Sequence, residues 1–150
     1  MLKFIKNGNI FDSDAYALVN PVNCIGPMGA GLAKQFADKF KGLQAEFWEE
    51  CEAGRVWPGR LVPIYSEGKI IINFPTKGHW KDPSEYEYIR RGLITLYEYL
   101  HQVDRDDEPQ AGKVAIPKLG CGLGGLDWAI VRKMIENELK NSFVEIEVYE

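Results

Sequence analysis

Two glycine-rich segments, 20–33 and 120–127, each follow a short apolar run and lead into a helix-like stretch. A strand, a glycine loop and a helix start in that order expose backbone N–H groups and the positive end of a helix dipole, which suit a bound phosphate. Two such loops could clasp a diphosphate, although glycines also make ordinary tight turns. Neither loop matches a Walker loop or a dinucleotide fingerprint, which argues against nucleoside triphosphate hydrolysis and against hydride transfer. We predict a site for a phosphorylated ligand.

Strand-like and helix-like segments alternate along the whole chain. The hydrophobic pattern predicts strands at 2–5, 16–19, 61–65, 69–74, 114–116 and 143–149, and helices at 31–40, 43–52, 85–103 and 126–139. Such alternation predicts an α/β layered domain whose mostly buried sheet carries helices on both faces. Because ligands of these sheets bind outside the carboxyl ends of the strands, both glycine loops are expected at one edge.

Local signals predict the limits of several elements. For the helix at 85–103, Asp82 is the expected cap, Pro83 the first helical residue and Glu85 the acid of a capping box. Apolar and acidic residues alternate in the last segment, 143–149, which predicts a half-exposed edge strand. The polar stretch 104–112 is predicted to be an exposed loop.

Length and composition narrow the class of protein. A chain of 150 residues predicts one domain, 1–150, and a formal charge of −4 argues against general attraction to nucleic acid. Cys24, Cys51 and Cys121 form no close pair, and the N-terminus lacks the apolar run of a signal peptide, so a cytoplasmic location is predicted. Apolar runs fall far short of the ~20 residues that span a bilayer, so no membrane partner is expected. His79 and His101 are the only histidines, and no metal site is predicted.

Segment 73–80, Asn-Phe-Pro-Thr-Lys-Gly-His-Trp, begins in an apolar run and continues past its end with a lysine and two aromatic rings. Near a bound anion, the Lys77 amine could bind charge, donate a proton or attack an electrophilic carbon; otherwise it is a solvated turn residue. Trp80 could stack on a ligand ring or pack against the protein. Asn20 and Asn23 could each orient a sugar hydroxyl or stabilise a turn.

The aspartate after the second glycine loop and two of the cysteines can be explained by structural roles. Asp127 follows the second glycine loop and is as well placed to cap the next helix as to touch substrate. Cys24 and Cys121 have no evident base in the sequence, which favours a small buried role over thiol chemistry.

Four segments, 8–11, 20–33, 73–80 and 116–128, together resemble the macrodomain family, in the same order and over nearly the whole chain. The resemblance implies a macrodomain-like three-layer α/β/α sandwich with a mixed central sheet of about six strands. Within the family, the chain is most similar to the macrodomain of DarG-type antitoxins, which remove ADP-ribose from thymidine in DNA. It is more distantly similar to the human terminal ADP-ribose protein glycohydrolase. Segment 73–80 carries this closer likeness.

The resemblance also implies the roles of individual residues. Lys77 matches the catalytic lysine of this branch, and Asn23 matches the asparagine beside the distal ribose. Cleavage at the anomeric carbon develops oxocarbenium character, so the sugar must be positioned and a proton or nucleophile supplied. No cofactor or metal is implied. The implied ligand-binding residues are Asn9, Ile10, Asn20, Cys24, Gly29, Gly31, Leu32, Thr76, Pro117, Leu119, Gly120, Cys121, Gly122, Leu123, Gly124 and Gly125.

Two positions depart from the wider family pattern. Asn9 stands where macrodomains often carry an aspartate that accepts from the adenine amino group; its amide oxygen can still accept but has no charge. Gly124 stands where the human relative has an aspartate, so a lysine–aspartate pair is not assumed, and the DarG-type enzymes share the glycine. Those antitoxins usually continue into a toxin-binding region, and this chain is expected to be either a truncated antitoxin or a stand-alone relative.

The leading hypothesis is an ADP-ribosyl glycohydrolase that acts on ADP-ribosylated DNA. Its expected partners are ADP-ribose, the modified DNA and a cognate DNA ADP-ribosyltransferase toxin. A DNA strand could bind along a basic strip formed by Lys77, Lys81, Arg90 and Arg91. The alternatives are a non-catalytic ADP-ribose reader and an ADP-ribose 1″-phosphate phosphatase, because fold alone does not fix function.

Overall fold

The computed structural model describes residues 2–102 and 112–150. In these residues a six-stranded sheet has the order β1-β6-β5-β2-β4-β3. The first five strands of that order run parallel, and β3 is antiparallel to β4. The strands are β1 (Leu2–Ile5), β2 (Ala17–Val22), β3 (Val62–Ser66), β4 (Lys69–Pro75), β5 (Lys113–Ile116) and β6 (Glu145–Tyr149).

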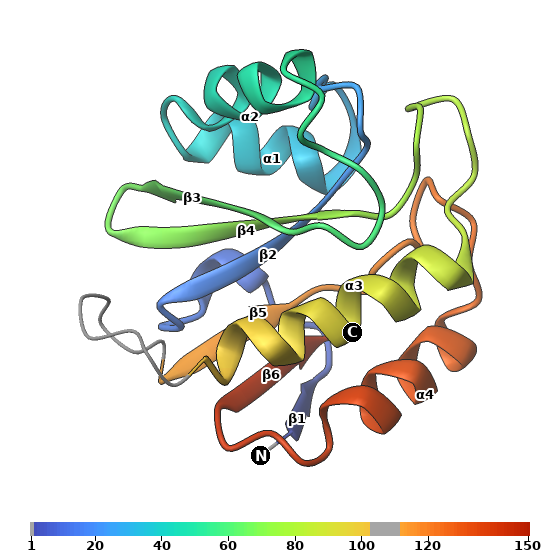
Figure 1. Cartoon of the computed structure of the whole chain (residues 1–150). Helices are drawn as coiled ribbons and strands as arrows, with labels where there is room; N and C mark the ends of the chain where they lie inside the picture. The colour runs from blue at the N-terminus through green and yellow to red at the C-terminus, as the bar shows by residue number, and fades with distance from the viewer. Residues whose placement is uncertain (1, 103–111) are drawn as a thin grey trace.

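Helices cover both faces of the sheet (Figure 1). They are α1 (Gly31–Lys39), α2 (Leu43–Glu52), α3 (Tyr86–Leu100) and α4 (Trp128–Leu139), with a short 3-10 turn η1 (Ile10–Asp12) before β2. One buried cluster joins α1 and α2 to the face that carries Leu18 and Ile71. A second cluster joins α3 and α4 to the face that carries Val19 and Ile72. Successive strand residues thus point to opposite cores, and the predicted three-layer α/β/α sandwich is confirmed.

The predicted capping of α3 by Asp82, with Pro83 as the first helical residue, is wrong. The helix begins at Tyr86, and Glu85 is its N-cap residue without a side-chain bond. Asp82 lies before the helix and accepts a hydrogen bond from the His79 N–H at 3.2 Å. At α4, by contrast, the capping role of Asp127 is confirmed, because its carboxylate accepts from the Ala129 N–H at 2.9 Å.

The prediction that 143–149 forms an edge strand is also wrong. β6 lies between β1 and β5, and the edges of the sheet are β1 and β3. Glu147, expected to face water, is buried and accepts a hydrogen bond from Ser13 Oγ at 2.8 Å. The alternating pattern therefore belongs to a central strand, in which the Glu147 carboxylate has a hydrogen-bond partner inside the protein. Most of the predicted loop 104–112 and the end of the helix predicted to reach 103 lie outside the described residues.

The topology brings three segments to one edge of the sheet. β5, β2 and β4 are parallel neighbours, so the residues after their carboxyl ends lie beside one another. These are the two glycine loops and the segment that begins at Thr76.

Candidate functional site

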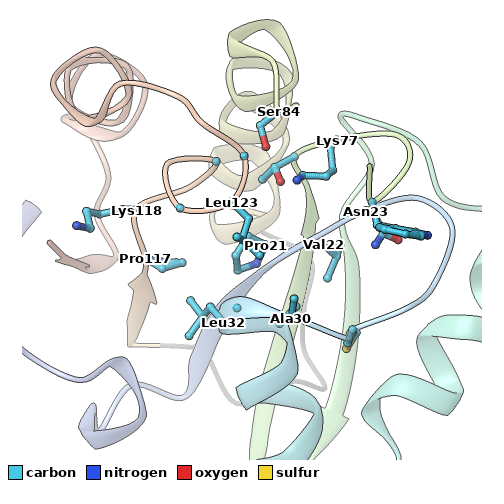
Figure 2. Close-up of a pocket in the computed structure, with 18 of the residues that line it drawn as sticks. Pro21, Val22, Asn23, Ala30, Leu32, Lys77, Ser84, Pro117, Lys118 and Leu123 are labelled. Atoms are coloured by element: carbon cyan, nitrogen blue, oxygen red, sulfur yellow. The ribbon is translucent and has the colours of Figure 1, made fainter. Parts of the chain in front are cut away.

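A cavity of about 1350 Å³ opens at this edge of the sheet. Its wall combines the loop after β2, the segment after β4, the loop after β5 and a short stretch before η1. Figure 2 shows side chains from these segments around the same space, with Leu32 and Ala30 opposite Leu123 and Lys77. The volume falls slightly above the usual range for small-molecule sites, about 300–1,000 Å³.

The first loop is organised by Asn23. Its Oδ1 accepts hydrogen bonds from the Ile25 and Gly26 N–H groups, each at 2.9 Å, and its Nδ2 donates to the Pro27 carbonyl at 3.0 Å. Asn23 also lines the cavity and is 7% exposed. One amide N–H remains for a ligand, so the side chain shapes the loop and still presents a donor to the cavity.

Asn20 lies behind the cavity rather than in its wall. Its Nδ2 donates to Asn73 Oδ1 at 3.0 Å, and Asn73 Nδ2 donates to the Val62 carbonyl at 3.0 Å. Both asparagine side chains are fully buried. This chain of amides joins β2, β4 and β3 just below the site and makes Asn20 a support for the strands. Its Oδ1 has no hydrogen-bond partner among the described residues, and its ligand contact stays a prediction.

The second glycine loop packs against Ser84. The Ser84 N–H donates to the Gly124 carbonyl at 3.0 Å. A Cβ at position 124 would lie 2.1 Å from Ser84 Oγ, so the space taken by that hydroxyl leaves room only for glycine. Ser84 Oγ is buried without a hydrogen-bond partner among the described residues, and Ser84 lines the cavity. A buried hydroxyl without a partner is costly, and a ligand oxygen would satisfy it.

The two glycine loops approach each other across the cavity. A Cβ at Gly31 would lie 3.3 Å from Leu123 Cδ1, and Gly31 has a φ of +58° that favours glycine. Leu123 is 74% exposed although it is a large apolar side chain. Its position over the first loop allows it to cover a ligand held between the loops.

Lys77 extends from the segment after β4 into the cavity, on the side of the cavity where Ser84 also lies (Figure 2). It forms no hydrogen bond or ion pair with the residues that the structure describes. Backbone bonds on both sides hold it: the Thr76 N–H donates to the Val22 carbonyl at 2.9 Å, and the Cys24 N–H donates to the Gly78 carbonyl at 2.8 Å. The amine is thus available to a ligand while its backbone is fixed to the first loop.

The cysteines near the site are poor nucleophiles. Burial raises the pKa of the Cys24 thiol to about 11, and burial likewise raises the pKa of Cys121 to about 11. Both thiols stay protonated at neutral pH, and the thiolate is the reactive form. The expectation that these residues do no thiol chemistry agrees with this environment.

Most of the predicted site residues lie together in the wall of the cavity. They are Asn9, Ile10, Asn23, Gly29, Gly31, Leu32, Thr76, Lys77, Pro117, Gly120, Gly122, Leu123, Gly124 and Gly125. Asn20, Cys24, Leu119 and Cys121 are not in the wall; Leu119, for instance, is fully buried in the core under α3 and α4. Sequence reasoning missed Met28, Ser84, Lys118 and Tyr149, which line the cavity.

The proposed basic strip is interrupted. Arg90 and Arg91 pair with Glu87 at 2.5 and 3.1 Å, and neither arginine lines the cavity. The hydrogen bond from Arg90 lowers the pKa of Glu87 to about 2, so the carboxylate stays charged beside both guanidinium groups. Lys77 and Lys81, in contrast, both reach the wall.

Residues 2–102 and 112–150 contain no cluster of three or more His, Cys, Asp or Glu side chains that could hold a metal ion. Nor does any helix in these ranges have the length and apolar content to cross a bilayer.

A sandwich of this topology with a cavity between two glycine loops defines an α/β ligand-binding domain. The Macro domain family model matches residues 19–135, and the chain belongs to the macrodomain family. A DNA ADP-ribosyl glycohydrolase of Thermus aquaticus is 40% identical over 100% of this chain and 41% of its own length. The chain thus spans about two fifths of the length of the curated DNA ADP-ribosyl glycohydrolases that it matches.

Solved structures show the same relationship. The macrodomain of Mycobacterium tuberculosis DarG has a TM-score of 0.90 and 35% identity, covering 99% of this chain and 97% of that one. Thermosipho africanus DarTG, solved in complex with ADP-ribose, has a TM-score of 0.86 and 29% identity, covering 98% of this chain and 41% of that one. A Thermosipho africanus relative named a DNA ADP-ribosyl transferase–glycohydrolase fusion is 28% identical over 97% of this chain and 41% of its own length.

Proposed function

We propose that this macrodomain is an ADP-ribosyl glycohydrolase that removes ADP-ribose from thymidine in DNA. The observation that carries the proposal is the Lys77 amine, which lies in the wall of the cavity without a protein partner among the described residues. Lys77 thus serves no structural ion pair or hydrogen bond among the described residues. The activity named for the Thermus aquaticus relative supports the same reaction.

The row of strands suggests how the ligand lies. Asn9, Ile10 and Tyr149 line the cavity near β6, the two glycine loops line its middle, and Lys77 lines it after β4. We propose that adenosine occupies the first part, the diphosphate binds the backbone N–H groups of the loops, and the distal ribose lies between Asn23 and Lys77. The Asn9 side chain already accepts from the Phe11 N–H at 3.0 Å, so its oxygen has one lone pair left for adenine.

The reaction breaks the bond between the ribose anomeric carbon and the thymine base. The bonding electrons leave with the base, which takes up a proton, and water finally supplies the hydroxyl at the anomeric carbon. Lys77 either donates the proton to the base or attacks the carbon to form an adduct that water then releases. Asn23 holds the ribose so that Lys77 is in line for attack on the carbon, or within reach of the leaving base for proton donation.

The test is release of ADP-ribose from a short single-stranded DNA that carries ADP-ribosyl-thymidine, followed by mass spectrometry. We expect the wild type to release it and Lys77→Ala to be slower by about 10²–10⁴-fold, the usual contribution of a general acid or base. ADP-ribose should still bind to the variant. Binding without release by either protein would favour an ADP-ribose reader, and rapid phosphate release from ADP-ribose 1″-phosphate would favour the phosphatase.

We further propose that residues 1–150 form a single macrodomain, that it works in the cytoplasm on DNA, and that a DNA ADP-ribosyltransferase is its cognate partner. The Thermosipho africanus fusion, in which one chain is named for both activities, supports that partnership. Co-expression tests it: wild-type protein should protect cells from such a transferase, and Lys77→Ala should protect them less.

A further inference from the structure

Trp80 lies at the catalytic end of the cavity. It follows Lys77 by three residues and lines the same wall. Tyr149, the other aromatic residue in the described wall, belongs to β6, three positions away from β4 in the sheet order. Three steps of about 4.8 Å each separate β6 from β4, so Tyr149 and the segment that carries Trp80 lie on opposite sides of the two glycine loops. If adenosine lies near Tyr149, Trp80 lies beyond the anomeric carbon, where the base attached to ADP-ribose must be.

The Trp80 ring is exposed although its backbone is firmly held. Its side chain is 53% exposed. Within the turn, the Asp82 N–H donates to the His79 carbonyl at 3.0 Å, and the Lys81 N–H donates to His79 Nδ1 at 3.1 Å. The His79 and Trp80 rings lie 5.2 Å apart at 30°. A large flat apolar surface is therefore presented on a hydrogen-bonded turn, which limits the backbone entropy lost when a partner binds.

A positive charge accompanies the ring. Lys81 Nζ lies 5.0 Å from the centre of the Trp80 ring, and Lys81 also lines the cavity. Asp82, the acidic residue beside them in the wall, accepts a hydrogen bond from the His79 N–H at 3.2 Å. An indole next to a lysine is the combination that binds single-stranded nucleic acid, because bases stack on the ring and the amine contacts the phosphate backbone.

We propose that Trp80 stacks on a nucleobase of the modified DNA, with Lys81 at the neighbouring phosphate, and so sets the preference of the enzyme for a nucleotide over other carriers of ADP-ribose. The proposal rests on the proposed function, since it names what occupies the cavity beyond the scissile bond. Trp80 is a specificity residue for the group that leaves, and it takes no part in binding ADP-ribose itself.

Trp57 offers a matched control. It is 50% exposed and has the Arg60 guanidinium 4.9 Å from its ring, yet it does not line the cavity. We compare Trp80→Ala, Trp80→Phe and Trp57→Ala by two measurements: kcat/KM for release of ADP-ribose from the modified oligonucleotide, and the Kd for free ADP-ribose. Trp80→Ala should lower kcat/KM about 10- to 100-fold, the range found when a base-stacking aromatic is removed. Its Kd for ADP-ribose should stay within about twofold, Trp80→Phe should recover most of the loss, and Trp57→Ala should match the wild type.

Three results would overturn the proposal. They are an unchanged kcat/KM in Trp80→Ala, an equal loss in Trp57→Ala, and a loss of free ADP-ribose binding as large as the loss of kcat/KM. If the wild type releases no ADP-ribose from DNA, the proposed function fails, and binding then decides the inference. In that case the wild type should still bind the modified oligonucleotide more tightly than ADP-ribose, and Trp80→Ala should lose this gain; equal affinities would refute it.

Discussion

Asn23 holds the first glycine loop in shape, and we propose that it also binds the ligand. Three of the four hydrogen bonds that its amide can make go to the loop from Ile25 to Pro27. The residue that we propose lies beside the ribose therefore owes its position to bonds with its own neighbours. The proposed contact with sugar uses the donor that is left.

Replacing Asn23 by alanine should disturb the loop before it disturbs the chemistry. The Ile25 and Gly26 N–H groups lose their acceptor, and we expect the free energy of unfolding to fall by about 1–3 kcal/mol. ADP-ribose should bind more weakly, because the loop that we propose contacts its phosphates is no longer held. Chemical denaturation and calorimetry measure both effects.

Asn23→Asp is the matched variant. Its carboxylate keeps the two acceptor bonds but loses the donor to the Pro27 carbonyl, so its stability should fall between those of the wild type and Asn23→Ala. An alanine variant that unfolds like the wild type but turns over slowly would instead make Asn23 a purely catalytic group.

At the scale of elements, the packing of α3 on β4 fixes the segment that carries Lys77. Gly92 of α3 lies directly on the Phe74 ring, and a Cβ at position 92 would be 2.1 Å from Phe74 Cζ. Phe74 is fully buried two residues before Thr76. Close contact between a helix backbone and this ring thus sets where the strand ends and where Lys77 begins to reach the cavity.

Gly92→Ala should destabilise the protein even though alanine is the better helix former. We expect a net loss of up to about 2 kcal/mol, because overpacking costs about 1–3 kcal/mol and the gain in helix propensity returns at most about 1 kcal/mol. The free energy of unfolding in denaturant measures the net effect.

Two controls make the cause of that loss visible. Asn137→Ala, at an exposed position of α4, gains helix propensity without a clash and should stabilise the protein slightly. Phe74→Leu should recover part of the loss when combined with Gly92→Ala, because the shorter side chain makes room for the methyl group. A Gly92→Ala protein as stable as the wild type would show that Phe74 moves freely.

At the scale of the whole molecule, the cavity joins parts of the chain that are more than a hundred residues apart in sequence. Asn9 and Ile10 lie near the start of the chain, and Gly120 to Gly125 follow β5. A ligand that touches all of these segments binds the folded chain only, because the unfolded chain does not assemble the wall. Binding is therefore linked to global stability.

ADP-ribose should raise the free energy of unfolding by about 2.7 kcal/mol at a free concentration one hundred times its Kd. Thermal or chemical unfolding with and without the ligand gives this value. Lys77→Ala should keep most of the shift, because in the proposed binding mode the two glycine loops supply the contacts to the diphosphate. If ADP-ribose leaves the unfolding of both proteins unchanged, the cavity does not bind it.

The sequence alone determined the kinds of elements and their order. Hydrophobic periodicity and the Asp127 cap are local properties, and α2 and α4 end at the residues predicted for them. The motifs at 20–33, 73–80 and 116–128 indicated the macrodomain family, because backbone turns and chemistry-bearing side chains were readable in short segments.

Only the tertiary structure decided which residues meet. It places β6 inside the sheet through the buried Glu147, and it sets Asn20 behind the cavity, bonded to Asn73. It also brings Ser84 against Gly124, forty positions along the chain. These contacts join residues that are distant in sequence, and their energies depend on packing and on hydrogen-bond partners that no local pattern contains.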